Sequence, residues 1–171
     1  MTILITGGSG CGKSTYAERV IASNPHKKRY YIATMQVYDE ESVRRVARHR
    51  AQRQDKGFTT IERQKDLGAL ELESGCAVLL EDLPNLLANE MFDGGDPERI
   101  IPALESLNDR CGLLVLVTND IFSDGVVYPD MTQEYIRLLS RVNRAAAMMA
   151  DQVIEVVYSI PLYIKGGTSC V

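Results

Sequence analysis

The 171-residue sequence has no tryptophan, only three phenylalanines and only two histidines. Its four cysteines, Cys11, Cys76, Cys111 and Cys170, form no C-x-x-C pair. No two histidines or cysteines have the spacing of metal ligands, so nothing in the sequence supports a zinc site. This cysteine usage favours reduced thiols in a cytosolic protein over a disulfide framework.

Long apolar runs and strong positive charge are also missing. No hydrophobic stretch approaches the roughly 20 residues of a membrane-spanning helix, and the chain starts with a strand-like segment, not a signal peptide. The net charge of −4 disfavours nonspecific attraction to nucleic acid. Hydrophobic residues make up 45% and charged residues 25%, as in ordinary globular proteins. We therefore expect a cytoplasmic protein with one domain over residues 1–171, of which 166–171 form a flexible tail.

The strongest motif lies near the N-terminus, where residues 7–14 are GGSGCGKS. They match the phosphate-binding loop pattern G-x-x-x-x-G-K-[ST] between a strand-like and a helix-like segment. In such loops backbone N–H groups and the helix N-terminus bind phosphates, while the lysine reaches the β- and γ-phosphates and the hydroxyl binds Mg²⁺. We therefore predict a nucleoside triphosphate site. Its phosphate-binding residues are Gly7, Gly8, Ser9, Gly10, Cys11, Gly12, Lys13 and Ser14.

Apolar, β-rich segments alternate with helical ones along the chain, which predicts an α/β fold. Continuous apolar runs at 77–80 and 113–117 indicate strands covered on both faces, as in parallel sheets. We expect a mostly parallel, doubly wound sheet with helices on both faces and the ligand at the carboxyl ends of its strands. The expected strands are 2–6, 29–34, 77–81, 113–118, 153–158 and 162–165. The expected helices are 13–23, 40–53, 83–92, 97–110 and 131–150.

The expected strand over residues 77–81 ends in the acids Glu81 and Asp82. In phosphate-loop proteins a carboxylate at such a strand end holds the Mg²⁺ that bridges the phosphates, directly or through water. Glu81 is the first candidate for this role, and Asp82, through water, is the second. The alternative is a solvated strand end that holds no metal.

The expected helix over residues 40–53 begins with acids and ends with bases, which suits the helix macrodipole. Arg45, His49 and Arg53 recur every fourth residue and so share one face. Two guanidiniums beside an imidazole disfavour its protonated form, and a neutral imidazole is a competent nucleophile. A solvated basic face with an incidental histidine is the simpler interpretation of this helix by itself. A nucleic-acid-binding stripe is disfavoured by the negative net charge and the lack of interleaved aromatic residues.

Four parts of the sequence together resemble one family, the bifunctional adenosylcobinamide kinase/adenosylcobinamide-phosphate guanylyltransferases of cobalamin biosynthesis. The similarity spans nearly the whole chain. It is carried by residues 3–14, by 31–36 with 39–41 and 45–53, by 79–81 with 86–89, and by 117–120, 141–144, 150–153 and 164–166.

The resemblance implies a RecA-like fold and two successive reactions. A kinase step would move the terminal phosphate of ATP or GTP to the aminopropanol hydroxyl of adenosylcobinamide. A second step would pass GMP from a covalent guanylyl-histidine, at His49, to that phosphate, giving adenosyl-GDP-cobinamide. Lys13 and Mg²⁺ would stabilise phosphoryl charge in both steps. The family commonly assembles as a trimer, so we expect a homo-oligomer.

The resemblance also implies nucleotide contacts outside the phosphate loop. These would come from Ala33, Thr34, Met35, Arg50, Ala51, Gln52, Arg53, Glu62 and Glu81. The chain departs from the family pattern at Gly10, Gln54, Phe58, 82–84 and 119–127. The last of these segments is expected to contact the corrinoid, so its sequence bears on substrate choice and on whether both activities are kept.

Two other functions remain open at the level of sequence. One is a different phosphate-loop kinase that acts on a small alcohol, with His49 in a structural role. The other is a noncatalytic protein that senses GTP and docks to a partner. Covalent labelling of the protein by GTP would separate the bifunctional kinase/guanylyltransferase from a different kinase. Turnover of cobinamide would separate it from a GTP sensor.

Overall fold

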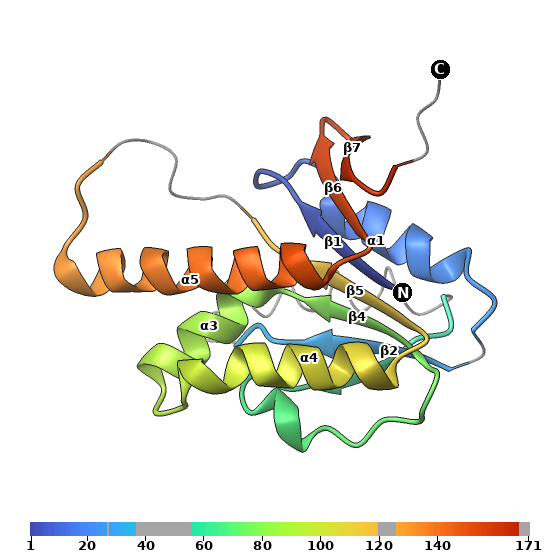
Figure 1. The fold of residues 1–171 in the computed structure, drawn as a ribbon, viewed down its shortest axis with the longest axis horizontal. Helices are drawn as coiled ribbons and strands as arrows, with labels where there is room; N and C mark the ends of the chain where they lie inside the picture. Colours follow the sequence, from blue (N-terminus) through green and yellow to red (C-terminus); the bar gives the residue numbers. More distant parts are fainter. Residues whose placement is uncertain (27, 37–55, 120–125, 168–171) are drawn as a thin grey trace.

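The computed structural model describes residues 1–26, 28–36, 56–119 and 126–167. Within these residues the chain forms a seven-stranded sheet flanked by helices (Figure 1). The strands are β1 (Thr2–Thr6), β2 (Arg29–Ala33), β3 (Thr59–Glu62), β4 (Ala77–Glu81), β5 (Leu113–Val117), β6 (Gln152–Val157) and β7 (Ile160–Lys165). The helices are α1 (Lys13–Ala22), α3 (Leu83–Phe92), α4 (Ile100–Arg110) and α5 (Asp130–Met149), with the 3-10 turns η1 (Leu67–Ala69) and η2 (Pro97–Arg99).

The strands lie in the order β3-β2-β4-β5-β1-β6-β7. All neighbouring pairs are parallel except the hairpin of β6 and β7. One strand, β5, separates β1, which leads into the glycine-rich loop, from β4, which ends in Glu81. This is the strand arrangement of RecA-like folds, and it confirms the predicted α/β class.

Both faces of the sheet carry a hydrophobic core, which explains the continuous apolar runs in the central strands. Helix α1 covers one face, and α3, α4 and α5 cover the other (Figure 1). Along β1, Ile3 and Ile5 pack on the α1 side, whereas Leu4 packs on the opposite side. Along β5, Val115 and Leu116 divide between the two faces in the same way.

The sequence missed the edge strand β3. This strand pairs with β2, but three of its four residues are exposed. It therefore lacks the apolar pattern from which strands are predicted. The expected helix over residues 97–110 begins instead as the turn η2, because the Asp96 carboxylate accepts the Glu98 N–H at 3.1 Å and caps that turn. The expected helix over residues 40–53 lies outside the described residues.

The C-terminal part of the chain differs from prediction in the position of its last strand. Strand β7 begins at Ile160, earlier than expected, and extends the β6–β7 hairpin. Gly166, which was expected to begin a flexible tail, accepts a hydrogen bond from Gln152 Nε2 at 3.3 Å. Residues 168–171 lie outside the described residues.

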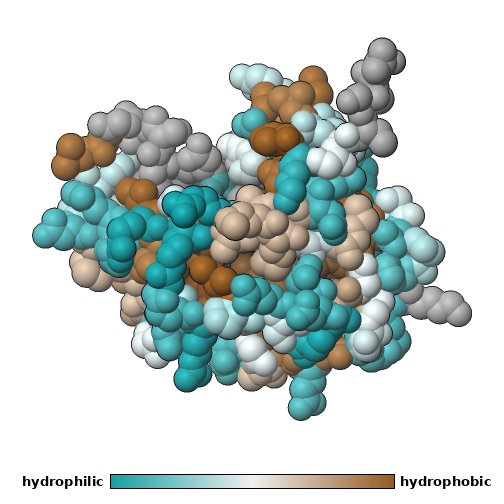
Figure 2. Space-filling model, in the orientation of Figure 1, coloured by the Kyte–Doolittle hydropathy of each residue, from teal (hydrophilic) through white to brown (hydrophobic). Residues whose placement is uncertain are grey.

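Apolar side chains remain exposed on the β6–β7 hairpin, at the top of the space-filling view (Figure 2). Ile160, Leu162, Tyr163 and Ile164 are each between 47% and 64% exposed. No helix in the described ranges has both the length and the apolar character needed to cross a bilayer.

Candidate active site

The glycine-rich loop leaves the carboxyl end of β1 and ends at the first turn of α1. Gly7 and Gly12 have φ values of +148° and +94°, a region that favours glycine. A Cβ on Gly7 would lie 2.5 Å from the Val156 carbonyl oxygen, and one on Gly12 would lie 2.6 Å from Ser159 Oγ. Neither position therefore accepts a side chain in this conformation. These two glycines of the motif shape the loop.

Lys13 and Ser14 are the first residues of α1, at the end of the helix where its dipole favours anions. The Lys13 ammonium donates to the Gly8 carbonyl oxygen at 3.0 Å, so it lies against the loop. The first turn of α1, which is entirely within the described part of the chain, contains no acidic residue. The loop thus presents a cation and free helix N–H groups without a nearby carboxylate on the same turn, which suits a phosphate chain.

Glu81 faces this helix end from the carboxyl end of β4. One carboxylate oxygen accepts from the Ser14 hydroxyl, and the other accepts from the Tyr31 hydroxyl at 2.8 Å. A hydroxyl and a carboxylate are the hard oxygen ligands that Mg²⁺ prefers. Ser14 and Glu81, predicted as metal ligands from distant parts of the sequence, are therefore in contact and fit the ion.

Asp82 plays a different part. Its Oδ1 atom accepts both the backbone N–H and the side-chain amide of Asn85 at 2.8 Å, so it caps α3. Burial raises the pKa of its carboxyl, and the Asn85 hydrogen bonds and the Glu81 charge act as smaller, opposed influences. Because one of its oxygens is committed to the cap, Asp82 is the weaker of the two candidates for the metal. A water-mediated contact from Asp82 stays a prediction.

Thr34 is fully buried, next to the backbone of Glu81 and Asp82. Its hydroxyl accepts the Asp82 N–H at 2.7 Å and lies 3.0 Å from the Glu81 carbonyl oxygen. The peptide bond between the two acids is cis. The Asn89 side chain donates to the Thr34 carbonyl oxygen at 2.7 Å. In this structure Thr34 supports the strand end that carries Glu81.

The sheet register places two other predicted nucleotide contacts, Ala33 and Glu62, in line with Glu81 on neighbouring strands. Ala33 of β2 pairs with Glu81 on one side and with Glu62 on the other. Met35 follows β2 at the same edge of the sheet and is partly exposed. The predicted residues Arg45, His49, Arg50, Ala51, Gln52 and Arg53 lie outside the described residues.

Tyr31 is the site residue that sequence reasoning missed. It is 3% exposed and lies in an apolar run, where it looks like a core residue. Its ring packs edge-on against Phe58, with ring centroids 6.1 Å apart. The alternation of β2 and β4 puts Tyr31 and Glu81 on one face of the sheet, but this becomes visible only once the two strands are paired.

The fold and the site define the class of the protein. A glycine-rich loop, a lysine and a hydroxyl at a helix start, and a carboxylate two strands away form the nucleotide site of a phosphate-loop NTPase. Residues 3–164 match the family model of cobinamide kinase/cobinamide phosphate guanyltransferase. The chain belongs to this family of bifunctional enzymes of adenosylcobalamin biosynthesis, as the sequence resemblance implied.

Relatives in the same family align with nearly the full length of the chain. The chain is 33% identical to the bifunctional adenosylcobalamin biosynthesis protein CobU of Escherichia coli K12, with 96% of this chain and 100% of that protein aligned. It is 32% identical to the bifunctional adenosylcobalamin biosynthesis protein CobP of Pseudomonas aeruginosa, with 97% and 98% aligned.

Solved structures of low sequence identity share the fold. The flagellar accessory protein FlaH of Methanocaldococcus jannaschii superposes with a TM-score of 0.53 at 12% identity, covering 98% of this chain and 80% of that one. A protein of Pyrococcus horikoshii OT3 gives 0.54 at 10% identity, covering 98% and 87%. At these identities the likeness concerns the architecture alone.

Proposed function

We propose that this protein phosphorylates adenosylcobinamide with ATP or GTP and then guanylylates the product through a covalent intermediate on His49. The observation that supports the nucleotide site best is the contact of Ser14 with Glu81 beside Lys13, at the end of α1. Family membership supplies the acceptor, a corrinoid. The proposed product of the two steps is adenosyl-GDP-cobinamide.

In the kinase step, an acceptor hydroxyl oxygen forms a bond to the γ-phosphorus while the bond to the β,γ-bridging oxygen breaks, so that the nucleoside diphosphate leaves and the hydroxyl proton passes to solvent. The loop N–H groups and Lys13 hold the phosphates and stabilise the charge that develops on their oxygens. Ser14 and Glu81 would hold Mg²⁺, which shields the negative charge of the triphosphate when bound.

In the guanylyl step, an imidazole nitrogen of His49 attacks the α-phosphorus of GTP and pyrophosphate leaves. A phosphate oxygen of the phosphorylated acceptor then attacks the same phosphorus and regenerates the histidine. The predicted contacts of Arg50, Ala51, Gln52 and Arg53 would hold the nucleotide for this attack. Four further residues are proposed to contact the same nucleotide: Ala33, which pairs with Glu81, Glu62, which pairs with Ala33 on its other side, and Thr34 and Met35, which follow β2.

We also propose that the enzyme is cytoplasmic and forms a homo-oligomer, a trimer by analogy with its family. Exposed apolar side chains on the β6–β7 hairpin favour a contact between copies, because such patches are costly on a lone subunit. Free thiols at Cys11, Cys76 and Cys111 suit a reducing compartment.

Two variants separate the proposed steps. The full chain is incubated with adenosylcobinamide, Mg²⁺ and either ATP or GTP, and the corrinoid products are identified by mass spectrometry. The wild type is expected to add a phosphate and then GMP. His49→Ala should stop at the phosphorylated product, whereas Lys13→Ala should slow the phosphorylation. Nucleotide binding without any change in the corrinoid would contradict the proposal and favour a GTP sensor.

A further inference from the structure

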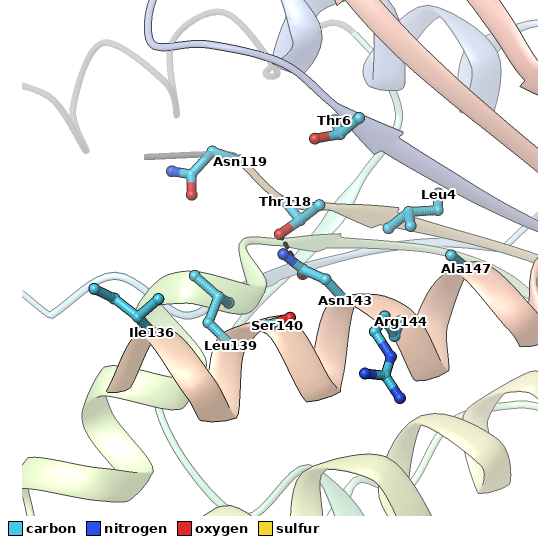
Figure 3. A pocket seen from close by; sticks show the side chains of 10 residues that line it. All are labelled: Leu4, Thr6, Thr118, Asn119, Ile136, Leu139, Ser140, Asn143, Arg144 and Ala147. Atoms are coloured by element: carbon cyan, nitrogen blue, oxygen red, sulfur yellow. Dashed lines mark hydrogen bonds between the residues drawn. The ribbon is translucent and has the colours of Figure 1, made fainter. Parts of the chain in front are cut away.

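A cavity of about 440 Å³ lies on the sheet face opposite α1, between α5 and the carboxyl ends of β1 and β5 (Figure 3). Thr6, the last residue before the phosphate loop, borders it. Thr118 and Asn119 border it from the end of β5, where the Thr118 N–H donates to the Ile5 carbonyl oxygen at 2.9 Å. The cavity therefore adjoins the strand end from which the phosphate loop starts.

The wall of the cavity combines apolar surface with two amide groups. Ile136 and Leu139 line it from α5. The two amides belong to Asn119, which follows β5, and to Asn143, from α5, which lies against the Thr118 hydroxyl (Figure 3). The one charged side chain among the lining residues, Arg144, is exposed at the rim. A neutral ligand fits this wall better than an anion, because a buried anion needs facing cations.

The amide groups of the cavity are incompletely satisfied. Asn119 Oδ1 is buried and accepts no hydrogen bond from any described residue. The Thr118 hydroxyl donates to Asn143 Oδ1 at 2.7 Å, which fixes the Asn143 amide and leaves its N–H groups without an acceptor in the described ranges. A buried acceptor without a donor costs free energy, and rotation of the Asn119 amide toward the cavity, which Asn119 lines, would let a ligand donor complete it.

We propose that this cavity binds the aminopropanol arm of the acceptor, a proposal that rests on the function given above. A secondary amide has the matching polarity, because its N–H would donate to Asn119 Oδ1 once that amide turns into the cavity, and its carbonyl oxygen would accept from Asn143 Nδ2. The short alkyl chain then packs on Ile136 and Leu139. The hydroxyl at the end of the arm passes Thr6 toward the phosphate loop, where the terminal phosphate is transferred.

The test compares two acceptors in the presence of Mg²⁺ and a nonhydrolysable GTP analogue. One is adenosylcobinamide, and the other is an analogue with a plain carboxamide in place of the aminopropanol arm. Asn119→Leu removes the buried acceptor and fills the space. It should weaken calorimetric binding of the full acceptor by at least about tenfold, because the amide N–H loses its partner. It should leave binding of the truncated acceptor within about twofold, because that ligand does not reach the amide.

A second variant tests the cavity without touching a polar group. Ile136→Phe fills the apolar wall and should show the same selective loss. Ile101→Phe, at a half-buried isoleucine of α4 outside the cavity, serves as the matched control and should bind both acceptors like the wild type. Thermal unfolding of each variant verifies that it is folded.

Four results overturn the proposal. Equal losses for both acceptors would show that the arm lies elsewhere, as would an unchanged affinity for the full acceptor in both filling variants. A fall in affinity for the GTP analogue alone would assign Asn119 to the nucleotide. Failure of the wild type to bind adenosylcobinamide would overturn the proposed function as well, so the two failures are distinguishable.

Discussion

The Glu81 carboxylate is held between two hydroxyl groups, those of Ser14 and Tyr31. Ser14 lies at the end of the predicted phosphate loop, whereas Tyr31 holds the carboxylate from the neighbouring strand β2. A carboxylate that is already oriented loses less conformational entropy when it takes a metal ion. At the scale of single residues, we therefore propose Tyr31 as a positioning residue for the predicted metal ligand Glu81.

Replacing Tyr31 with phenylalanine removes this hydrogen bond and keeps the ring that packs on Phe58. We expect GTP affinity in the presence of Mg²⁺ to fall by about 1 kcal/mol, the typical worth of a hydrogen bond. Affinity measured in EDTA should not change. Tyr30→Phe is the matched control, because the Tyr30 hydroxyl contacts Glu73, far from the loop, at 3.4 Å. Equal losses with and without Mg²⁺ would contradict the role of Tyr31.

The cysteines give a second prediction at this scale. Cys76 and Cys111 are buried, and burial raises the pKa of both thiols, that of Cys111 to about 12. The thiolate is the reactive form, so both side chains should resist alkylation at pH 8. Cys11 in the loop is partly exposed and should react first. Mass spectrometry of iodoacetamide-treated Cys170→Ser protein tests this order, and simultaneous modification of all three thiols would disprove it.

The site residues differ in how well the sequence predicts them. Lys13, Ser14 and Glu81 follow from local patterns, and the structure brings them together. The contribution of Tyr31 depends on the pairing of β2 with β4, which no local pattern encodes. The cap formed by Asp82 was also not predicted, because an acid after a strand looks the same whether it binds a metal or caps the next helix.

At the scale of elements, the loop after β1 is braced by the β6–β7 hairpin. The Ser159 N–H donates to the Cys11 carbonyl oxygen at 2.8 Å, and Gly7 approaches the Val156 carbonyl oxygen closely. The hairpin turn itself uses left-handed residues, with φ of +50° at Tyr158 and +66° at Ser159. The phosphate loop therefore keeps its shape partly through contacts from the far end of the chain.

Gly7→Ala tests this bracing. Alanine would adopt an unfavourable positive φ and bring its Cβ to 2.5 Å from Val156 O, so the loop must shift. We expect GTP affinity to fall more than about tenfold, since the loss of loop geometry misplaces several N–H donors. Gly68→Ala, at a glycine with open space around it, is the control and should bind GTP normally. Normal binding by Gly7→Ala would show that the loop conformation is unimportant.

The elements themselves were predicted well where burial produces a pattern. The central strands β1, β4 and β5 are apolar on both faces and lie where the sequence places them. The prediction was wrong at the edge, because β3 is largely exposed and polar and so resembles a loop. The start of α4 was shifted by a cap on the turn before it.

At the scale of the whole molecule, a hydrophobic core on each face of the sheet holds the strands whose carboxyl ends carry the candidate site. Groups buried in these cores make stability depend on pH in the alkaline range. The pKa of Tyr135 is raised to about 12 by burial, as is that of Cys111, while their ordinary values are 10.0 and 9.0. Unfolding exposes these groups, so between about pH 9 and 12 the unfolded chain releases protons that the folded chain keeps.

Stability should therefore be highest below pH 9 and fall as the pH rises toward 12. Chemical denaturation at a series of pH values measures this slope. Cys111→Ala removes one of the groups and should flatten the curve, although it lowers stability at neutral pH by leaving a small cavity. A slope that is unchanged in this variant would show that Cys111 contributes nothing to the alkaline loss.

The proposed function requires that the nucleotide bound at the phosphate loop reacts with this chain at His49. The most direct measurement incubates the protein with Mg²⁺ and GTP labelled at the α-phosphate, without acceptor, and counts label on the denatured chain. We predict an acid-labile label on the wild type, at up to one GMP per chain, that is absent from His49→Ala and undiminished in a variant at the other histidine, His26→Ala. An unlabelled wild type, or a labelled His49→Ala, would contradict a guanylyl intermediate on His49.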